Sequence, residues 1–177
     1  MSHPIIDYKN TNRTVAAVFI GLVVIIAGLI VMSRPGSFAS SNSLNSQSNS
    51  KSLLAAGETF FDFGTISMAK GKVSKSFSIK NPTANTIIAK KLYTSCMCTK
   101  ASLTQGDIRV GPFGMPSHGG IVPISVEIAP GAEAIVEAVF DPAAHGPAGV
   151  GPISRDVYLE TSDGGKLTLS FKANVTP

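Results

Sequence analysis

Cys96 and Cys98 carry the most reactive side chains of the sequence, and they are its only two cysteines. Thiolates bind soft metal ions, so a Cys-x-Cys pair predicts a site for Cu(I) or for zinc. In an extended strand both side chains point to the same side, with Cα atoms about 6.6 Å apart. That separation is near the upper limit for a disulfide, so a direct bond between the two sulfurs would need a local bend.

A metal site needs more ligands than two thiolates, since strong zinc signatures supply four at defined spacings. Among the remaining sulfur and imidazole groups, the candidates for additional ligands are Met97, Met115, His118 and His145. Met115 and His118 share the segment GMPSHGG, so we expect this segment to supply additional ligands if it folds toward Cys96. His145 stands alone in DPAAHGP, where a loop histidine is ordinarily a solvated side chain.

Two other interpretations of the cysteine pair stay open. A thiol-redox pair exchanges electrons by disulfide interchange and needs one exposed cysteine with a lowered pKa. Lys90, Lys91 and Lys100 could lower that pKa electrostatically, but the spacing lacks the helix N-terminus that activates a Cys-x-x-Cys pair. A purely structural pair would form a local disulfide, or pack two small thiols at the end of a strand.

Catalytic constellations are missing from the sequence. It contains no GxxxxGK, no HExxH and no recognisable Ser-His-Asp arrangement, and its carboxylates are scattered singly along predicted strands and turns. We therefore expect a binding or structural protein and not an enzyme.

Residues 15–32 form an uninterrupted apolar run, VAAVFIGLVVIIAGLIVM. A helix of this length satisfies its own backbone and crosses roughly 27 Å of bilayer. A cleaved signal peptide is the alternative, but its apolar core usually has about 7 to 15 residues. Lys9 and Arg13 precede the run, whereas only Arg34 follows it closely, so residues 1–14 are predicted to be cytoplasmic. The prediction is a single-pass protein of the cell membrane with its C-terminal domain outside the cytoplasm.

Residues 33–56 are predicted to be a flexible linker, because their Ser/Asn-rich sequence cannot bury enough surface to offset the entropy of ordering. Residues 57–177 form the predicted domain. Of the net charge of +4, four basic residues against Asp7 place +3 before Gly57, and eleven basic against ten acidic residues leave +1 after it. Nucleic-acid binding needs a basic patch, so we expect none.

From Phe60 onward, apolar and polar residues alternate with the period of a strand that has one buried face. In KVSKSFSIK, Val73, Phe77 and Ile79 share one face, and lysines and serines share the other. The same alternation recurs in four later segments: 124–128, 134–140, 157–159 and 167–173. No long amphipathic helix follows residue 32, so the apolar sheet faces must pack on each other. This predicts an all-β fold, an immunoglobulin-like antiparallel β-sandwich of about seven strands, preceded by one N-terminal transmembrane helix.

Residues typical of turns separate these segments. Asn81-Pro82, Pro130-Gly131 and residues 162–165 are predicted turns. Residues 110–120 and 141–152 are rich in glycine and proline, so we expect them to form long loops and not strands.

Several fragments are similar to one known family. They are FFDFGTI at 60–66, SFSIKN at 76–81, TSCMCT at 94–99, and the later VFDP, His145-Gly146 and VYLETSD. Together they resemble the bacterial family of domain-of-unknown-function number 1573, over most of residues 60–175. The resemblance implies a seven-stranded Ig-like sandwich, similar to major sperm protein and Hydin-type domains, with a Thr-Ser-Cys-x-Cys-Thr signature. Met97 stands where glycine is usual, and the family's function is uncharacterised.

The sequence thus predicts a membrane-anchored extracytoplasmic Ig-like module that binds a protein or another envelope component through sheet edges or long loops. The alternative function is soft-metal binding, with copper as the candidate ion, or thiol-redox chemistry. Both alternatives use Cys96 and Cys98, and Met115 and His118 are the predicted additional metal ligands.

Overall fold

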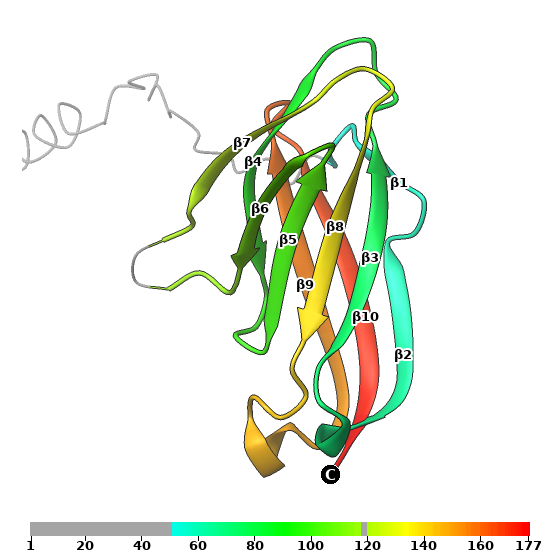
Figure 1. Cartoon of the computed structure of the whole chain (residues 1–177), viewed down its shortest axis with the longest axis vertical. Coiled ribbons are helices and arrows are strands. Elements are labelled where there is room, and N and C mark those ends of the chain that lie inside the picture. Colours follow the sequence, from blue (N-terminus) through cyan, green and yellow to red (C-terminus); the bar gives the residue numbers. More distant parts are fainter. Residues whose placement is uncertain (1–50, 118–119) are drawn as a thin grey trace, which may run out of the picture. The chain divides into compact units, whose positions relative to one another are not determined.

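The alternating segments of the sequence form two facing sheets (Figure 1). The computed structural model describes residues 51–117 and 120–177, and within them there are ten strands. The first sheet has the order β1 (Ala55–Ala56), β3 (Val73–Lys80), β8 (Glu133–Phe140), β5 (Thr99–Gln105), β6 (Ile108–Phe113). The second has the order β2 (Phe60–Ser67), β10 (Lys166–Thr176), β9 (Gly151–Thr161), β4 (Ile87–Thr94), β7 (Pro123–Ile128). The predicted all-β fold of two packed sheets is confirmed, with more strands than the seven expected.

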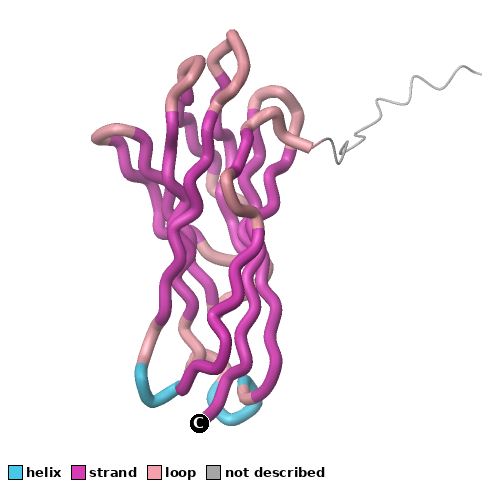
Figure 2. The backbone as a smooth tube through the Cα atoms, turned by 90° about the vertical axis from the view of Figure 1, so that its right-hand side faces the viewer, coloured by secondary structure: helices cyan, strands magenta, loops and turns pink. Residues whose placement is uncertain are grey.

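The core lies between the two layers, which Figure 2 shows from the side. Every second residue of β8 is buried, from Ala134 to Phe140, and the same holds for β10 from Leu167 to Val175. In β3, Phe77 and Ile79 are buried while Ser76 and Ser78 are exposed, as the alternation predicts. Two short 3-10 helices, η1 (Met68–Lys70) and η2 (Gly146–Gly149), lie at one end of the sandwich.

The strand pairing is antiparallel with one exception. β2 runs parallel to β10, with Phe60 beside Ser170 and Ser67 beside Thr176. The sequence analysis predicted only antiparallel pairs, because alternation fixes which face is buried and carries no information about strand direction.

One predicted loop is partly a strand. Residues 110–113 belong to β6, which pairs with β5 through Val110 opposite Leu103 and Phe113 opposite Ala101. β6 is the edge of its sheet, where proline is tolerated because one side of the strand needs no hydrogen bonds. The prediction of a loop over 110–120 was therefore wrong for its first part. The other predicted loop, 141–152, contains η2 and gives way to β9 at Gly151.

The domain also begins earlier than predicted. Residues 51–56 were assigned to the linker, but Ser52 and Leu54 are buried and β1 pairs with the end of β3. The segment is held against the β9–β10 turn, because Ser52 Oγ lies 3.0 Å from Thr161 Oγ1 and the Leu53 amide donates to Asp163 Oδ2 at 2.8 Å. The prediction placed Leu54 in the linker because the residues before it are rich in Ser and Asn.

Among the described residues, no helix is long and apolar enough to cross a membrane. The predicted cytoplasmic segment 1–14, the predicted span 15–32 and the predicted linker up to residue 50 lie outside the described residues.

Candidate metal centre

Two loops that cross between the sheets meet at one end of the sandwich. Residues 95–98 connect β4 to β5, and residues 141–150 connect β8 to β9. Strand register brings the loops together, because Thr99 at the start of β5 pairs with Phe140 at the end of β8. The Asp141 amide then donates to the Cys98 carbonyl at 2.9 Å, which ties the second loop to the first.

Cys96 and Cys98 lie in a turn and not in the extended strand considered above. The Thr99 amide donates to the Cys96 carbonyl at 3.2 Å and closes the turn. The buried Thr94 hydroxyl lies 2.9 Å from the Cys96 carbonyl oxygen and 3.0 Å from that of Thr99. The Thr94 side chain thus binds both ends of the segment that carries Cys96 and Cys98.

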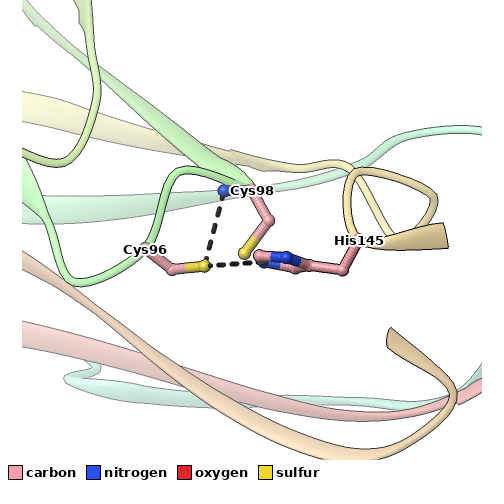
Figure 3. A group of neighbouring side chains, drawn as sticks. All are labelled: Cys96, Cys98 and His145. Atoms are coloured by element: carbon pink, nitrogen blue, oxygen red, sulfur yellow. Dashed lines mark hydrogen bonds between the residues drawn. The ribbon is translucent and has the colours of Figure 1, made fainter. Parts of the chain in front are cut away.

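The second loop is shaped by local hydrogen bonds that position His145. The Ala143 amide donates to Asp141 Oδ1 at 3.0 Å, and the Gly146 amide donates to the Ala143 carbonyl at 2.9 Å. Asp141 forms an Asx-type turn of the kind that reverses a chain without regular structure. These hydrogen bonds shape the loop so that the imidazole of His145 points toward the two sulfurs (Figure 3).

The three side chains form a compact group. Cys96 Sγ lies 3.2 Å from His145 Nε2, and the ligand atoms of Cys96, Cys98 and His145 all lie within 4.8 Å of one another. Both cysteines are free thiols. Cys98 is buried, Cys96 is partly buried and His145 is exposed, so the group extends from the core to the surface.

A fourth group, Arg155, completes the site. Its Nε donates to Cys98 Sγ at 3.3 Å, and its Nη1 donates to the Ser154 carbonyl at 2.7 Å. Arg155 is not among the site residues predicted from the sequence, although a signal is present. Counting back by two from the buried Val157 places Arg155 on the face of β9 that points into the sandwich, where a charged residue is unusual.

These contacts give the thiols of Cys96 and Cys98 different pKa values. Partial burial opposes ionisation of Cys96, but donors from the Cys98 side chain and backbone and from His145, with the charge of Arg155, lower the pKa of Cys96 to about 7. Burial raises the pKa of Cys98, and so does its hydrogen bond to Cys96. Cys96 therefore ionises first, with Cys98 as a protonated donor beside it.

The other predicted metal ligands are Met115 and His118. Met115 follows β6 and is 49% exposed, and His118 lies outside the described residues. Their contribution to a metal site stays a prediction. His145, which the sequence analysis considered less promising than the Met115 segment, is the residue that lies beside the cysteines.

Two thiolates and an imidazole on one side of a site are a ligand set for soft or borderline metal ions. In the described part of the chain, no other group of three Cys, His, Asp or Glu side chains lies this close together. The same atoms also make Cys96 a potential nucleophile, because a thiolate is the reactive form of cysteine.

Residues 54–114 match the model of the family described as "Protein of unknown function (DUF1573)". The resemblance found in the sequence is confirmed for this part of the chain, which contains the cysteine turn. The match ends at residue 114, so it does not extend over the later fragments of the resemblance. No match was found among curated proteins.

Solved structures with a similar fold include a protein of unknown function from Porphyromonas gingivalis W83. It has a TM-score of 0.50 and 17% identity over 71% of this chain, which spans 48% of that protein. The PapD-like domain 7 of human CEP192 matches with a TM-score of 0.42 and 11% identity, covering 71% of this chain and 87% of that domain. The periplasmic chaperone SfaE matches with a TM-score of 0.38 and 8% identity, covering 70% of this chain and 58% of that protein.

Proposed function

We propose that this chain binds a soft metal ion at one end of its β-sandwich, through the thiolates of Cys96 and Cys98 and the imidazole of His145. The observation that carries the proposal is the convergence of the three ligand atoms to within 4.8 Å of one another from two separate loops. Their order of burial also suits a metal site. Cys98 is fixed by the core, and the exposed His145 leaves a path by which an ion can enter.

The test is a metal titration of the reduced full chain in detergent micelles, with Cu(I) and with Zn(II) in separate experiments. We expect one ion to bind per chain. Binding should disappear in Cys96→Ser and in Cys98→Ser, and weaken in His145→Ala, because each variant removes one ligand. Ala144→Ser changes an exposed neighbour in the same loop and should bind as the wild type does. Stoichiometric binding that survives the double cysteine variant would refute the proposal.

We propose further that residues 15–32 anchor the protein in the cell membrane and that the described domain lies outside the cytoplasm. The support is the 18-residue apolar sequence with Lys9 and Arg13 before it. The full chain should stay with membranes after an alkaline carbonate wash, and a chain without residues 15–32 should be released. Added protease should digest the domain in spheroplasts. Protection of the domain would contradict the proposed orientation.

We propose as a second function that the domain is a binding module without enzymatic activity, which binds a protein or another envelope component. The supporting observation concerns β6 and β7, each of which is one of the two edge strands of its sheet. Ile108 on β6 is 52% exposed and Val122, just before β7, is 60% exposed. Apolar edges can pair with a strand from another protein.

Photo-crosslinking in cells tests this partner role. A photoreactive residue at position 108 or 122 should capture a protein that the same residue at Val150 does not, since Val150 is also exposed but lies in the loop after η2. Equal capture from all three positions would contradict a specific edge contact.

A further inference from the structure

The metal site contains a fixed positive charge in addition to its ligands. Arg155 Nε contacts Cys98 Sγ directly, and the guanidinium stays protonated at any physiological pH. Among the residues that the structure describes, no carboxylate forms an ion pair with Arg155. Its hydrogen bonds go to the Cys98 sulfur and to the Ser154 carbonyl.

This charge changes the electrostatic balance between a monovalent and a divalent ion. Two thiolates contribute a charge of −2 and Arg155 contributes +1. The neutral imidazole of His145 adds no charge, so the site without an ion carries −1. A monovalent ion brings the total to zero, whereas a divalent ion leaves a net positive charge. Because Cys98 is buried and Arg155 is partly buried, an uncompensated charge at this position costs free energy.

The coordination number points the same way. The described residues supply three ligands, and structural zinc sites are almost always closed by four. A zinc ion in this site would need a water or an additional ligand. Thiolates bind both Cu(I) and zinc, so the low number of ligands, and not the sulfur itself, favours Cu(I). The hydrogen bond from Arg155 to Cys98 is compatible with coordination, because side chains that do not touch the metal commonly donate hydrogen bonds to the residues that do.

We infer that Arg155 makes the site selective for the monovalent ion Cu(I) over divalent zinc. Arg155 acts as a specificity-determining residue that touches a ligand and not the ion. This inference rests on the proposed metal-binding function and adds the class of ion and the residue that selects it.

The experiment compares Cu(I) and Zn(II) affinities of the reduced full chain, each measured by competition with a chromogenic chelator of that ion. The ratio of the two affinities is the readout, because loss of the hydrogen bond to Cys98 affects both ions. Arg155→Gln should shift this ratio toward zinc by about tenfold or more, since one unit charge near the ion is removed. Arg155→Lys keeps the charge and should keep most of the Cu(I) preference.

Arg109→Gln is the matched control and should leave the ratio unchanged, because Arg109 lies on the edge strand β6 and pairs with Glu137 of β8. The inference is overturned if Arg155→Gln and Arg109→Gln give the same ratio, or if the wild type prefers zinc. If Arg155→Gln does not fold, the test compares the wild type with Arg155→Lys. Loss of the Cu(I) preference in the folded lysine variant then overturns the inference. A wild type that binds neither ion refutes the proposed function itself, which distinguishes the two failures.

Discussion

Arg155 donates a hydrogen bond of 3.3 Å from Nε to the sulfur of Cys98, from a position of β9 that faces the interior of the sandwich. The residue opposite Arg155 on β10 is Phe171, which is fully buried. Arg155 is partly buried, and its polar contacts are the Cys98 sulfur and the Ser154 carbonyl, with the Cys96 sulfur close by. The charge of Arg155 and the two sulfurs therefore form one unit.

The pH dependence of alkylation should distinguish the two cysteines. Iodoacetamide reacts with the thiolate, so labelling of Cys96 in the metal-free chain should rise with pH with a midpoint near 7, where the pKa of Cys96 lies. Cys98, with 2% exposure and a raised pKa, should stay unlabelled in the native state. Labelling is read by peptide mass spectrometry.

In Cys98→Ala, the midpoint for Cys96 should move to higher pH because the variant removes a donor that stabilises the thiolate. An unchanged midpoint would show that the neighbouring thiol does not control Cys96. Labelling of Cys98 first would contradict the assignment of the two thiols.

Thr94→Val tests the turn that presents the sulfurs. The substitution keeps the shape of the buried side chain but removes the hydroxyl that bonds to the Cys96 and Thr99 carbonyls. We expect the free energy of unfolding to fall by about 1–2 kcal/mol, measured with denaturant, and metal affinity to fall with it. Thr168→Val is the control, because Thr168 is exposed on β10. Equal stability of the two variants would mean that the Thr94 hydroxyl does not hold the turn.

Gly149→Val tests the position of His145. A Cβ at Gly149 would lie 3.3 Å from His145 Cβ and 3.4 Å from Met68 Cε, so a branched side chain must displace one of them. We expect metal affinity to fall severalfold while Cys96 alkylation persists, since the cysteine turn is untouched. Ala148→Val, at the exposed neighbouring position, should bind metal normally. Wild-type affinity in Gly149→Val would argue against His145 as a ligand.

Gly165→Ala tests the docking of residues 51–56. A Cβ at Gly165 would overlap the backbone of Ser52, so the N-terminal segment must move away from the β9–β10 turn. The expected loss of unfolding free energy is about 1–3 kcal/mol, with faster proteolysis between residues 51 and 56. Gly57→Ala meets no atom within 4 Å and should behave as the wild type. Unchanged protease resistance in Gly165→Ala would contradict the described packing.

The sequence was sufficient to predict the sandwich because alternation is a local signal. The buried faces of β3, β8 and β10 follow directly from it, and the predicted turn at Pro130-Gly131 lies between β7 and β8. Strand β6 was missed because proline and glycine disfavour central strands far more than edge strands, and a sequence does not show which strand will be at an edge.

The site was predictable only in part. The spacing of Cys96 and Cys98 indicated soft-ligand chemistry, but His145 lies 49 positions further along and reaches them through the pairing of β5 with β8. That pairing is a long-range property that local patterns do not contain. Arg155 was detectable in principle, because its two-residue offset from Val157 places a charge on an otherwise apolar face.

The docking of Ser52 beside Thr161 has a consequence for how the protein would meet its surroundings. Thr161 and Arg155 are six residues apart on the same extended strand, a separation of about 20 Å. The N-terminal residues of the described domain thus lie toward the Thr161 end of β9, away from Arg155 and from the sulfur that it contacts. If residues 15–32 anchor the chain and the sulfurs bind an ion, as proposed above, a longer segment before residue 51 is expected to leave the metal affinity unchanged.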